Sequence, residues 1–159
     1  MRWFWIDRVT YLDKGKKARA VKNVSLAEEH LHDHFPGYPV MPQALMIEGM
    51  AQTGGILAGS VSGFTENIVL AKVSKASFHR HVHPGDQMIF ESELVDSGPN
   101  GYRAETRITV DGVLTAESSM MFAAVPGVAG ETAFVFKDNL MALLRECPGF
   151  NPQASGSHQ

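Results

Sequence analysis

"PQALMIEGMAQTGGILAG", residues 42–59, decides the fold because it predicts one long buried helix. Pro42 suits the first turn of a helix, where its missing N–H leaves no helical hydrogen bond unmade. After Gln43, only Glu48 and Gln52 are strongly polar, and their spacing of four places them on one face. A helix that is apolar on nearly all sides is one that the rest of the protein buries.

Four glycines in this stretch indicate what buries the helix. Each lowers the helix propensity by about 1 kcal/mol relative to alanine. We expect close packing of the helix backbone against a broad surface, such as a β-sheet, to offset this loss. The glycines are Gly49, Gly54, Gly55 and Gly59.

Strand-like segments surround the helix and predict an antiparallel sheet. Residues 5–13 and 16–24 alternate in polarity on either side of Lys14-Gly15, as in an opening hairpin. Asp111-Gly112 is a strong signal for a two-residue hairpin turn, and short links favour antiparallel pairing. We therefore expect an α+β fold in which a sheet wraps around one long buried helix. The later strands are predicted over residues 67–79, 85–98, 101–110 and 113–125.

The composition describes one soluble domain. The chain has 159 residues, of which 44% are hydrophobic, so it can form its own core. We expect a single domain over residues 1–125, a C-terminal extension with a short helix over 126–147, and a disordered tail over 148–159.

Several classes of protein are disfavoured. The net charge of −3 argues against a nucleic-acid binder. Asp7 and Arg8 interrupt the apolar start, so it resembles neither a signal peptide nor a membrane span. The single cysteine, Cys147, allows no disulfide within the chain. We expect a cytoplasmic protein with no nucleic-acid or membrane partner.

Glu48 and His34 are the candidate catalytic pair. A carboxylate is costly to keep charged in an apolar environment, so Glu48 can hold a proton and act as a general acid. His34 can act as a base near neutral pH, and Phe35-Pro36-Gly37 would hold its loop stiffly. The two residues are 14 positions apart, so they can meet either within one chain or across a subunit interface.

The start of the helix is a third element of this site. Backbone N–H groups near Gln43 and Ala44 have no partner within the helix, and the helix dipole lies behind them. Such groups stabilise an oxyanion. A base, an acid and an oxyanion site together fit proton abstraction beside a carbonyl followed by loss of a hydroxyl.

Two histidine clusters offer a rival, metal-binding interpretation. His30, His32, Asp33 and His34 are ligand types at close spacing, but one residue short of the metallo-β-lactamase signature. His79, His81 and His83 would share one face of a predicted strand. We favour the interpretation without a metal or an organic cofactor.

The segment "HFPGYPVMPQALMIEGMAQTGG", residues 34–55, resembles the 3-hydroxyacyl-[acyl-carrier-protein] dehydratases of the FabZ type. The similarity extends over about residues 6–125, through "WIDRVTYLDKGKKARAVKNVSLAEEH" and "VHPGDQMIFESEL". The resemblance implies a hotdog fold, a homodimer or a hexamer built as a trimer of dimers, and acyl carrier protein as partner.

Site roles also follow from the resemblance. By motif position, His34 stands for the catalytic histidine and Glu48 for the catalytic acid, contributed by opposite subunits. Gln52 is similar to a glutamine that orients the acid or a water, and Gly37 to the loop glycine. A glutamate at position 48 favours the FabZ type over the isomerising FabA type.

The chain departs from the family pattern at three places. Gln43 replaces a glycine, "MRWFW" replaces the usual start, and residues 126–159 extend beyond the usual end. The expected function is dehydration of 3-hydroxyacyl thioesters on acyl carrier protein in fatty acid or related acyl-chain biosynthesis. The alternatives are a hotdog thioesterase, a specialised or polyketide-type dehydratase, and a non-catalytic acyl-thioester-binding subunit in which Gln43 closes the tunnel.

Overall fold

The helix predicted from residues 42–59 is present as α2, Gln43–Val61, with Pro42 immediately before it. The structure, a computed structural model, describes residues 4–99, 101–125, 140, 143–144 and 147–148. Met46, Met50 and Leu57 of α2 are at most 1% exposed. The prediction of one long helix packed into the core is confirmed.

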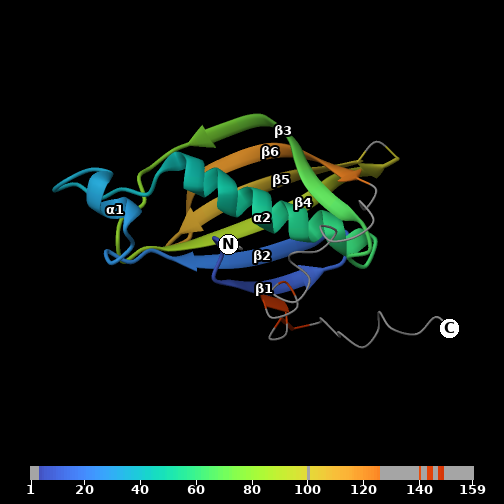
Figure 1. Ribbon diagram of the computed structural model, residues 1–159, viewed down its shortest axis with the longest axis horizontal. Coiled ribbons are helices and arrows are strands. Elements are labelled where there is room, and N and C mark those ends of the chain that lie inside the picture. The colour runs from blue at the N-terminus through green and yellow to red at the C-terminus, as the bar shows by residue number, and fades with distance from the viewer. Residues whose placement is uncertain (1–3, 100, 126–139, 141–142, 145–146, 149–159) are drawn as a thin grey trace.

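One six-stranded antiparallel sheet curves around α2, in the order β1-β2-β4-β5-β6-β3 (Figure 1). The helix lies against the concave side of this sheet, so the expected α+β arrangement is confirmed. The short helix α1 precedes α2 at one end of the molecule. The bounds are β1 Arg8–Asp13, β2 Lys17–Asn23, α1 His30–Asp33, β3 Asn67–Phe78, β4 Gln87–Gly98, β5 Gly101–Val110 and β6 Val113–Val125.

Both predicted hairpins form. Gly15 turns the chain between β1 and β2 with a φ of 68°, and its N–H donates to Ser60 Oγ at 3.0 Å, at the far end of α2. Asp111 and Gly112 have φ values of 51° and 75°. Two consecutive positive φ values are what a type I′ hairpin turn requires.

Glycines bring α2 close to two aromatic rings of the sheet. A Cβ atom on Gly49 would overlap the Phe90 ring, and one on Gly54 would lie 2.9 Å from Phe122. Phe90 is fully buried and Phe122 is 3% exposed. The glycines are therefore needed at these places for contact distance, as expected from the sequence.

The edge strand β3 is long, and its exposed part carries apolar side chains together with Lys72 and Lys75. It pairs with β6 on one side only. Val69, Leu70 and Val73 remain 43%, 43% and 36% exposed. The unpaired backbone groups of such an edge are a template for pairing with another strand.

The C-terminal part is described only at isolated positions. Leu140, Leu144 and Cys147 are buried and belong to the hydrophobic core, and Leu140, Leu143 and Leu144 have helical backbone. The remainder of the predicted extension and the tail from residue 149 on lie outside the described residues. Among the helices that the structure describes, none has the length and apolar character needed to cross a membrane.

Candidate active site

His34 follows α1 and lies in a loop that backbone hydrogen bonds hold in place. Phe35 N–H donates to the Tyr38 carbonyl at 3.0 Å, and Tyr38 N–H donates to the Phe35 carbonyl at 2.8 Å. Val40 N–H donates to the His34 carbonyl at 2.9 Å. Gly37 adopts a φ of 76°, in the region that favours glycine. These hydrogen bonds hold the backbone of His34 in place, and the imidazole side chain therefore extends from a fixed position.

The neighbours of the His34 ring determine which nitrogen can act as a base. Nδ1 lies 2.8 Å from the Val40 carbonyl oxygen. A carbonyl only accepts, so Nδ1 carries the hydrogen and donates it. In the neutral ring Nε2 then keeps its lone pair and can accept a proton. The ring also stacks on Phe35, with centroids 4.3 Å apart.

Glu48 lies in the second turn of α2 and is half-buried, less than the sequence indicated, because its face of the helix borders a cavity. Gln52 Nε2 donates to Glu48 Oε1 at 2.7 Å. The side-chain amide oxygen of Gln52, Oε1, accepts from the backbone N–H of Trp5 at 2.9 Å and from that of Ile6 at 3.3 Å. These donors fix the amide, so that its NH₂ group faces Glu48.

The cavity beside Glu48 has a volume of about 310 Å³. One face of α2 forms a wall, with Glu48 and Gln52 followed by smaller or apolar residues. The rest of the lining is mostly apolar but includes one more carboxylate; it consists of Phe4, Phe64, Glu66, Ile68, Leu70, Phe122 and Leu140. A mostly apolar space with a few polar groups is typical of a binding site for a small molecule with an apolar part.

The N-terminus of α2 is an open donor site. α2 has no side-chain cap, and its first bonds to Pro42 come from Leu45 and Met46. The N–H groups of Gln43 and Ala44 precede these bonds and have no acceptor within the helix. Both residues are exposed, and Gln43 is not among the residues that line the cavity.

The predicted site residues thus fall into two groups within one chain. His34, Gly37, Gln43 and Ala44 lie at or just before the start of α2. Glu48 and Gln52 lie farther along the helix, at the cavity. The contacts that the described residues give to His34 are with Val40 and Phe35 and do not include Glu48.

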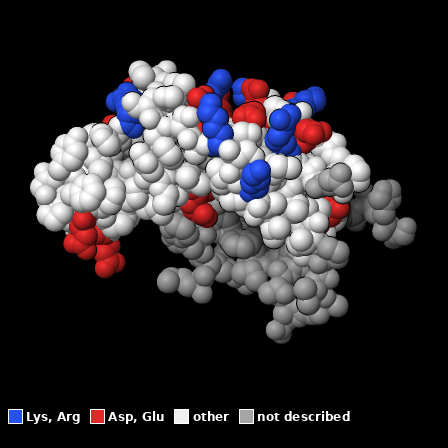
Figure 2. All heavy atoms as spheres, turned by 90° about the horizontal axis from the view of Figure 1, so that it is seen from above, with Lys and Arg blue, Asp and Glu red and all other residues white. Residues whose placement is uncertain are grey.

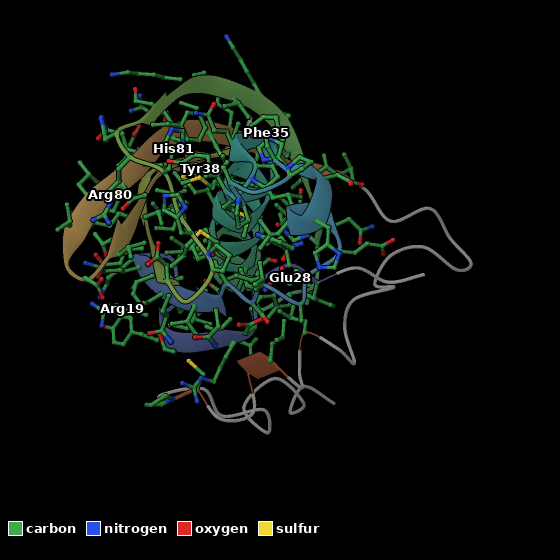
Figure 3. All side chains as sticks on the ribbon, turned by 90° about the vertical axis from the view of Figure 1, so that its left-hand side faces the viewer. Arg19, Glu28, Phe35, Tyr38, Arg80 and His81 are labelled. Carbon is green, nitrogen blue, oxygen red and sulfur yellow. The ribbon has the colours of Figure 1, made fainter. Side chains whose placement is uncertain are left out.

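The histidine clusters do not converge. His79, His81 and His83 follow β3, which ends at Phe78, so their predicted place on a strand is wrong. His81 and His83 pack against Tyr38, with ring centroids 6.4 and 5.4 Å away (Figure 3).

His30, in the other cluster, packs against the N-terminal segment. Its ring meets Trp5 edge-on at 5.3 Å, and burial lowers the pKa of this histidine. Within the described ranges, no group of three or more His, Cys, Asp or Glu side chains is placed to hold a metal ion.

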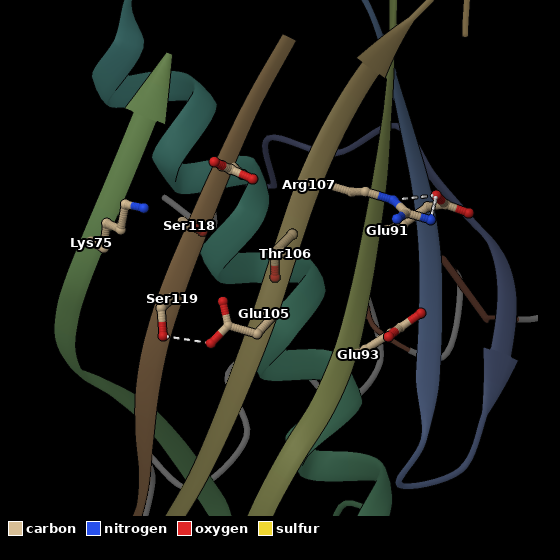
Figure 4. A pocket seen from close by; sticks show the side chains of 9 residues that line it. Lys75, Glu91, Glu93, Glu105, Thr106, Arg107, Ser118 and Ser119 are labelled. Carbon is tan, nitrogen blue, oxygen red and sulfur yellow. Dashed lines mark hydrogen bonds and ion pairs between the residues drawn. The ribbon is translucent and has the colours of Figure 1, made fainter. Parts of the chain in front are cut away.

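A second hollow, of about 270 Å³, lies on the outer face of the sheet (Figure 4). There Arg19 and Arg107 both bond to Glu91, at 2.6 and 2.9 Å. These guanidinium groups, with Arg19 the stronger, hold the pKa of Glu91 below its usual value. Figure 2 shows acidic and basic side chains interspersed along the upper margin of the molecule in that view. The network is a set of cross-strand ion pairs, which stabilise a solvated sheet face.

Two features of the site were not predicted. The backbone N–H groups of Trp5 and Ile6 hold the side chain of Gln52, whereas the sequence showed only that this start departs from the family pattern. Leu140 lines the cavity from beyond the expected domain end. The sequence feature that could have indicated a role for Leu140 is the apolar pattern of its segment, which was predicted as a short helix.

Comparison with known proteins identifies related sequences. The model of a family described as the FabA-like domain matches residues 3–119. A relative from Thiobacillus denitrificans is 39% identical over 120 residues, covering 73% of this chain and 83% of the relative. One from Pectobacterium atrosepticum is 46% identical over 121 residues, covering 74% and 80%. Both are named 3-hydroxyacyl-[acyl-carrier-protein] dehydratase FabZ.

Solved structures share the fold at low identity. The conserved protein PA5202 from Pseudomonas aeruginosa superimposes with a TM-score of 0.63 at 21% identity, covering 74% of this chain and 87% of that one. The Escherichia coli PaaI protein gives 0.61 at 12% identity, covering 75% and 79%. These similarities support the arrangement of the sheet around the helix.

Proposed function

Because the chain belongs to the family of FabA-like domains, we propose that it dehydrates 3-hydroxyacyl thioesters on acyl carrier protein to trans-2-enoyl thioesters. The observation that carries this proposal is Glu48, held by Gln52 at the wall of a mostly apolar cavity whose lining also includes Glu66. The hotdog fold supports the same reaction, and so do the relatives of this chain that are named as dehydratases. In this proposal the reaction is a step of fatty acid biosynthesis, and the protein acts in the cytoplasm.

The reaction assigns one task to each group. Nε2 of His34 takes the proton from the carbon next to the thioester carbonyl. The N–H groups of Gln43 and Ala44 hold the carbonyl oxygen as negative charge develops on it. Protonated Glu48 gives its proton to the leaving hydroxyl, so the C3–O bond breaks and water departs. Since Gln52 donates to Oε1, the other oxygen, Oε2, carries the proton to the substrate.

A homodimer can bring His34 and Glu48 together, which one chain does not do. In this proposal His34 of one chain faces Glu48 of the other, and each dimer has two sites. The exposed edge of β3 is the pairing surface in this proposal, because two such edges can continue one sheet across the dimer. A hexamer, as three of these dimers, stays a prediction from the resemblance.

The test follows formation of the conjugated enoyl thioester from 3-hydroxyacyl-acyl-carrier-protein. We expect His34→Ala and Glu48→Gln each to lower kcat by about 10²–10⁴-fold, the usual contribution of a general base or acid. Accumulation of the free 3-hydroxy acid in place of the enoyl product would identify a thioesterase. Tight carrier binding without turnover would identify a binding subunit.

Mixing the two inactive variants tests the shared site. A mixed dimer of His34→Ala and Glu48→Gln chains contains one intact His34–Glu48 pair. Random exchange of equal amounts should therefore restore about a quarter of wild-type activity, since half of the dimers carry one good site of two. No restoration after proven subunit exchange would place each site within a single chain.

A further inference from the structure

The cavity beside Glu48 runs along α2. Its helical wall is formed by residues spaced three or four apart, which share one face of a helix. From Glu48 to Gly59 this face extends about 16 Å, at 1.5 Å per residue. The wall comprises Glu48, Ala51, Gln52, Gly55, Ile56 and Gly59. The polar groups of this wall lie at the Glu48 end, and the glycines leave room farther along.

Leu140 also lines this cavity. It is only 5% exposed and belongs to the core cluster that contains Ile56, Phe64 and Phe122. Its side chain therefore occupies space that the cavity would otherwise include. Leu140 lies beyond residues 3–119, which match the family model. This part of the wall is an addition to the shared domain.

We propose that Leu140 is a specificity-determining residue that limits the length of the acyl chain. The inference rests on the proposed function, in which the acyl chain enters this cavity from the Glu48 end. A close-packed wall cannot accept extra methylene groups without moving, whereas a smaller side chain opens room for them. In a hydrophobic pocket, one methylene changes kcat/KM by about tenfold or more.

The experiment compares kcat/KM for 3-hydroxyacyl-acyl-carrier-protein substrates of increasing chain length. Leu140→Ala should raise the ratio of longer to shorter substrates by about tenfold, because the wall recedes. Leu140→Phe should lower the same ratio. If Leu140→Ala does not fold, Leu140→Val, a smaller change, replaces it in the comparison with the wild type.

Leu144→Ala is the matched control. Leu144 is fully buried in the same segment but does not line the cavity. It should lose stability while keeping the wild-type chain-length profile. An unchanged profile in folded Leu140 variants, or an equal shift in Leu144→Ala, would overturn the inference. A wild-type chain that dehydrates no substrate of any length would instead overturn the proposed function.

Discussion

The amide of Gln52 has two chemically different ends, and each end has its own partners. Its oxygen accepts from the backbone of Trp5 and Ile6, and its NH₂ donates to Glu48. A flipped amide would set NH₂ against N–H and oxygen against carboxyl oxygen, losing all three bonds. The N-terminal segment therefore decides which oxygen of Glu48 stays available to substrate.

Replacing Gln52 by leucine should separate positioning from binding. We expect Gln52→Leu to lower kcat more than tenfold with little change in KM, because Glu48 loses its orientation rather than its affinity for substrate. Stability should fall by about 1–3 kcal/mol as the Trp5 and Ile6 N–H groups lose their acceptor. Steady-state kinetics and urea unfolding measure the two effects.

The control is Gln87→Leu, which removes an exposed glutamine bonded to Asn23. Its kinetics should match the wild type, and its stability should change by less than about 0.5 kcal/mol. Equal losses in kcat for both variants would show that Gln52 has no special role.

At this scale, the sequence could predict His34, Glu48 and Gln52 as site residues because a local motif contains all three. It could not identify the donors to Gln52, since Trp5 lies 47 residues away and contributes only its backbone. Main-chain groups are the same in every residue, so no side-chain pattern indicates them. The half-burial of Glu48 was missed because the cavity requires several distant elements.

Among the elements, α2 depends on glycines for its distance from the sheet. Gly49 faces Phe90 and Gly54 faces Phe122, whereas a Cβ added to Gly55 would make only an ordinary contact, 3.7 Å from Phe122. The sequence predicted close packing because four glycines in a buried helix need a compensating contact. It could not assign the aromatic partners, which lie on β4 and β6.

Gly49→Ala and Gly55→Ala test this dependence as a pair. Both changes improve helix propensity by about 1 kcal/mol. At Gly49 the new methyl overlaps the Phe90 ring, so strain of about 1–3 kcal/mol should make the variant less stable than wild type. At Gly55 the variant should be as stable as wild type or better. Urea midpoints decide, and equal midpoints would contradict the role given to Gly49.

For the whole molecule, the sheet order places β3 beside β6 and leaves the other edge of β3 unpaired, with exposed Val69, Leu70 and Val73 on this strand. The strands and their hairpins were predictable from alternation and turn residues. The neighbour of β3 was not, because its pairing with β6 joins segments separated by β4 and β5. The subunit contact that we assign to this edge depends on that order.

A charge on the β3 edge should separate the subunits. We expect Val73→Lys to shift the protein from dimer to monomer, because it replaces an apolar side chain of the proposed contact with a third lysine, next to Lys72 and Lys75. Activity should fall with it, since His34 and Glu48 then no longer meet. Light scattering and turnover at several protein concentrations measure both. A fully active monomer would contradict the shared site.

Val113→Lys is the matched control. Val113 is 51% exposed but lies beside the β5–β6 turn rather than on the β3 edge. This variant should stay dimeric and active. Loss of the dimer here too would indicate a general effect of added charge.

The place of β3 beside β6 also has a consequence for the order of events on the ribosome. β3 is complete at Phe78, but its partner is complete only at Val125. At about 5–20 residues per second, synthesis of the roughly 47 intervening residues takes roughly 2–9 s. During that interval the nascent chain carries an apolar strand with neither of its eventual neighbours. Slower translation between β3 and β6 would lengthen this exposure and favour aggregation before the sheet closes.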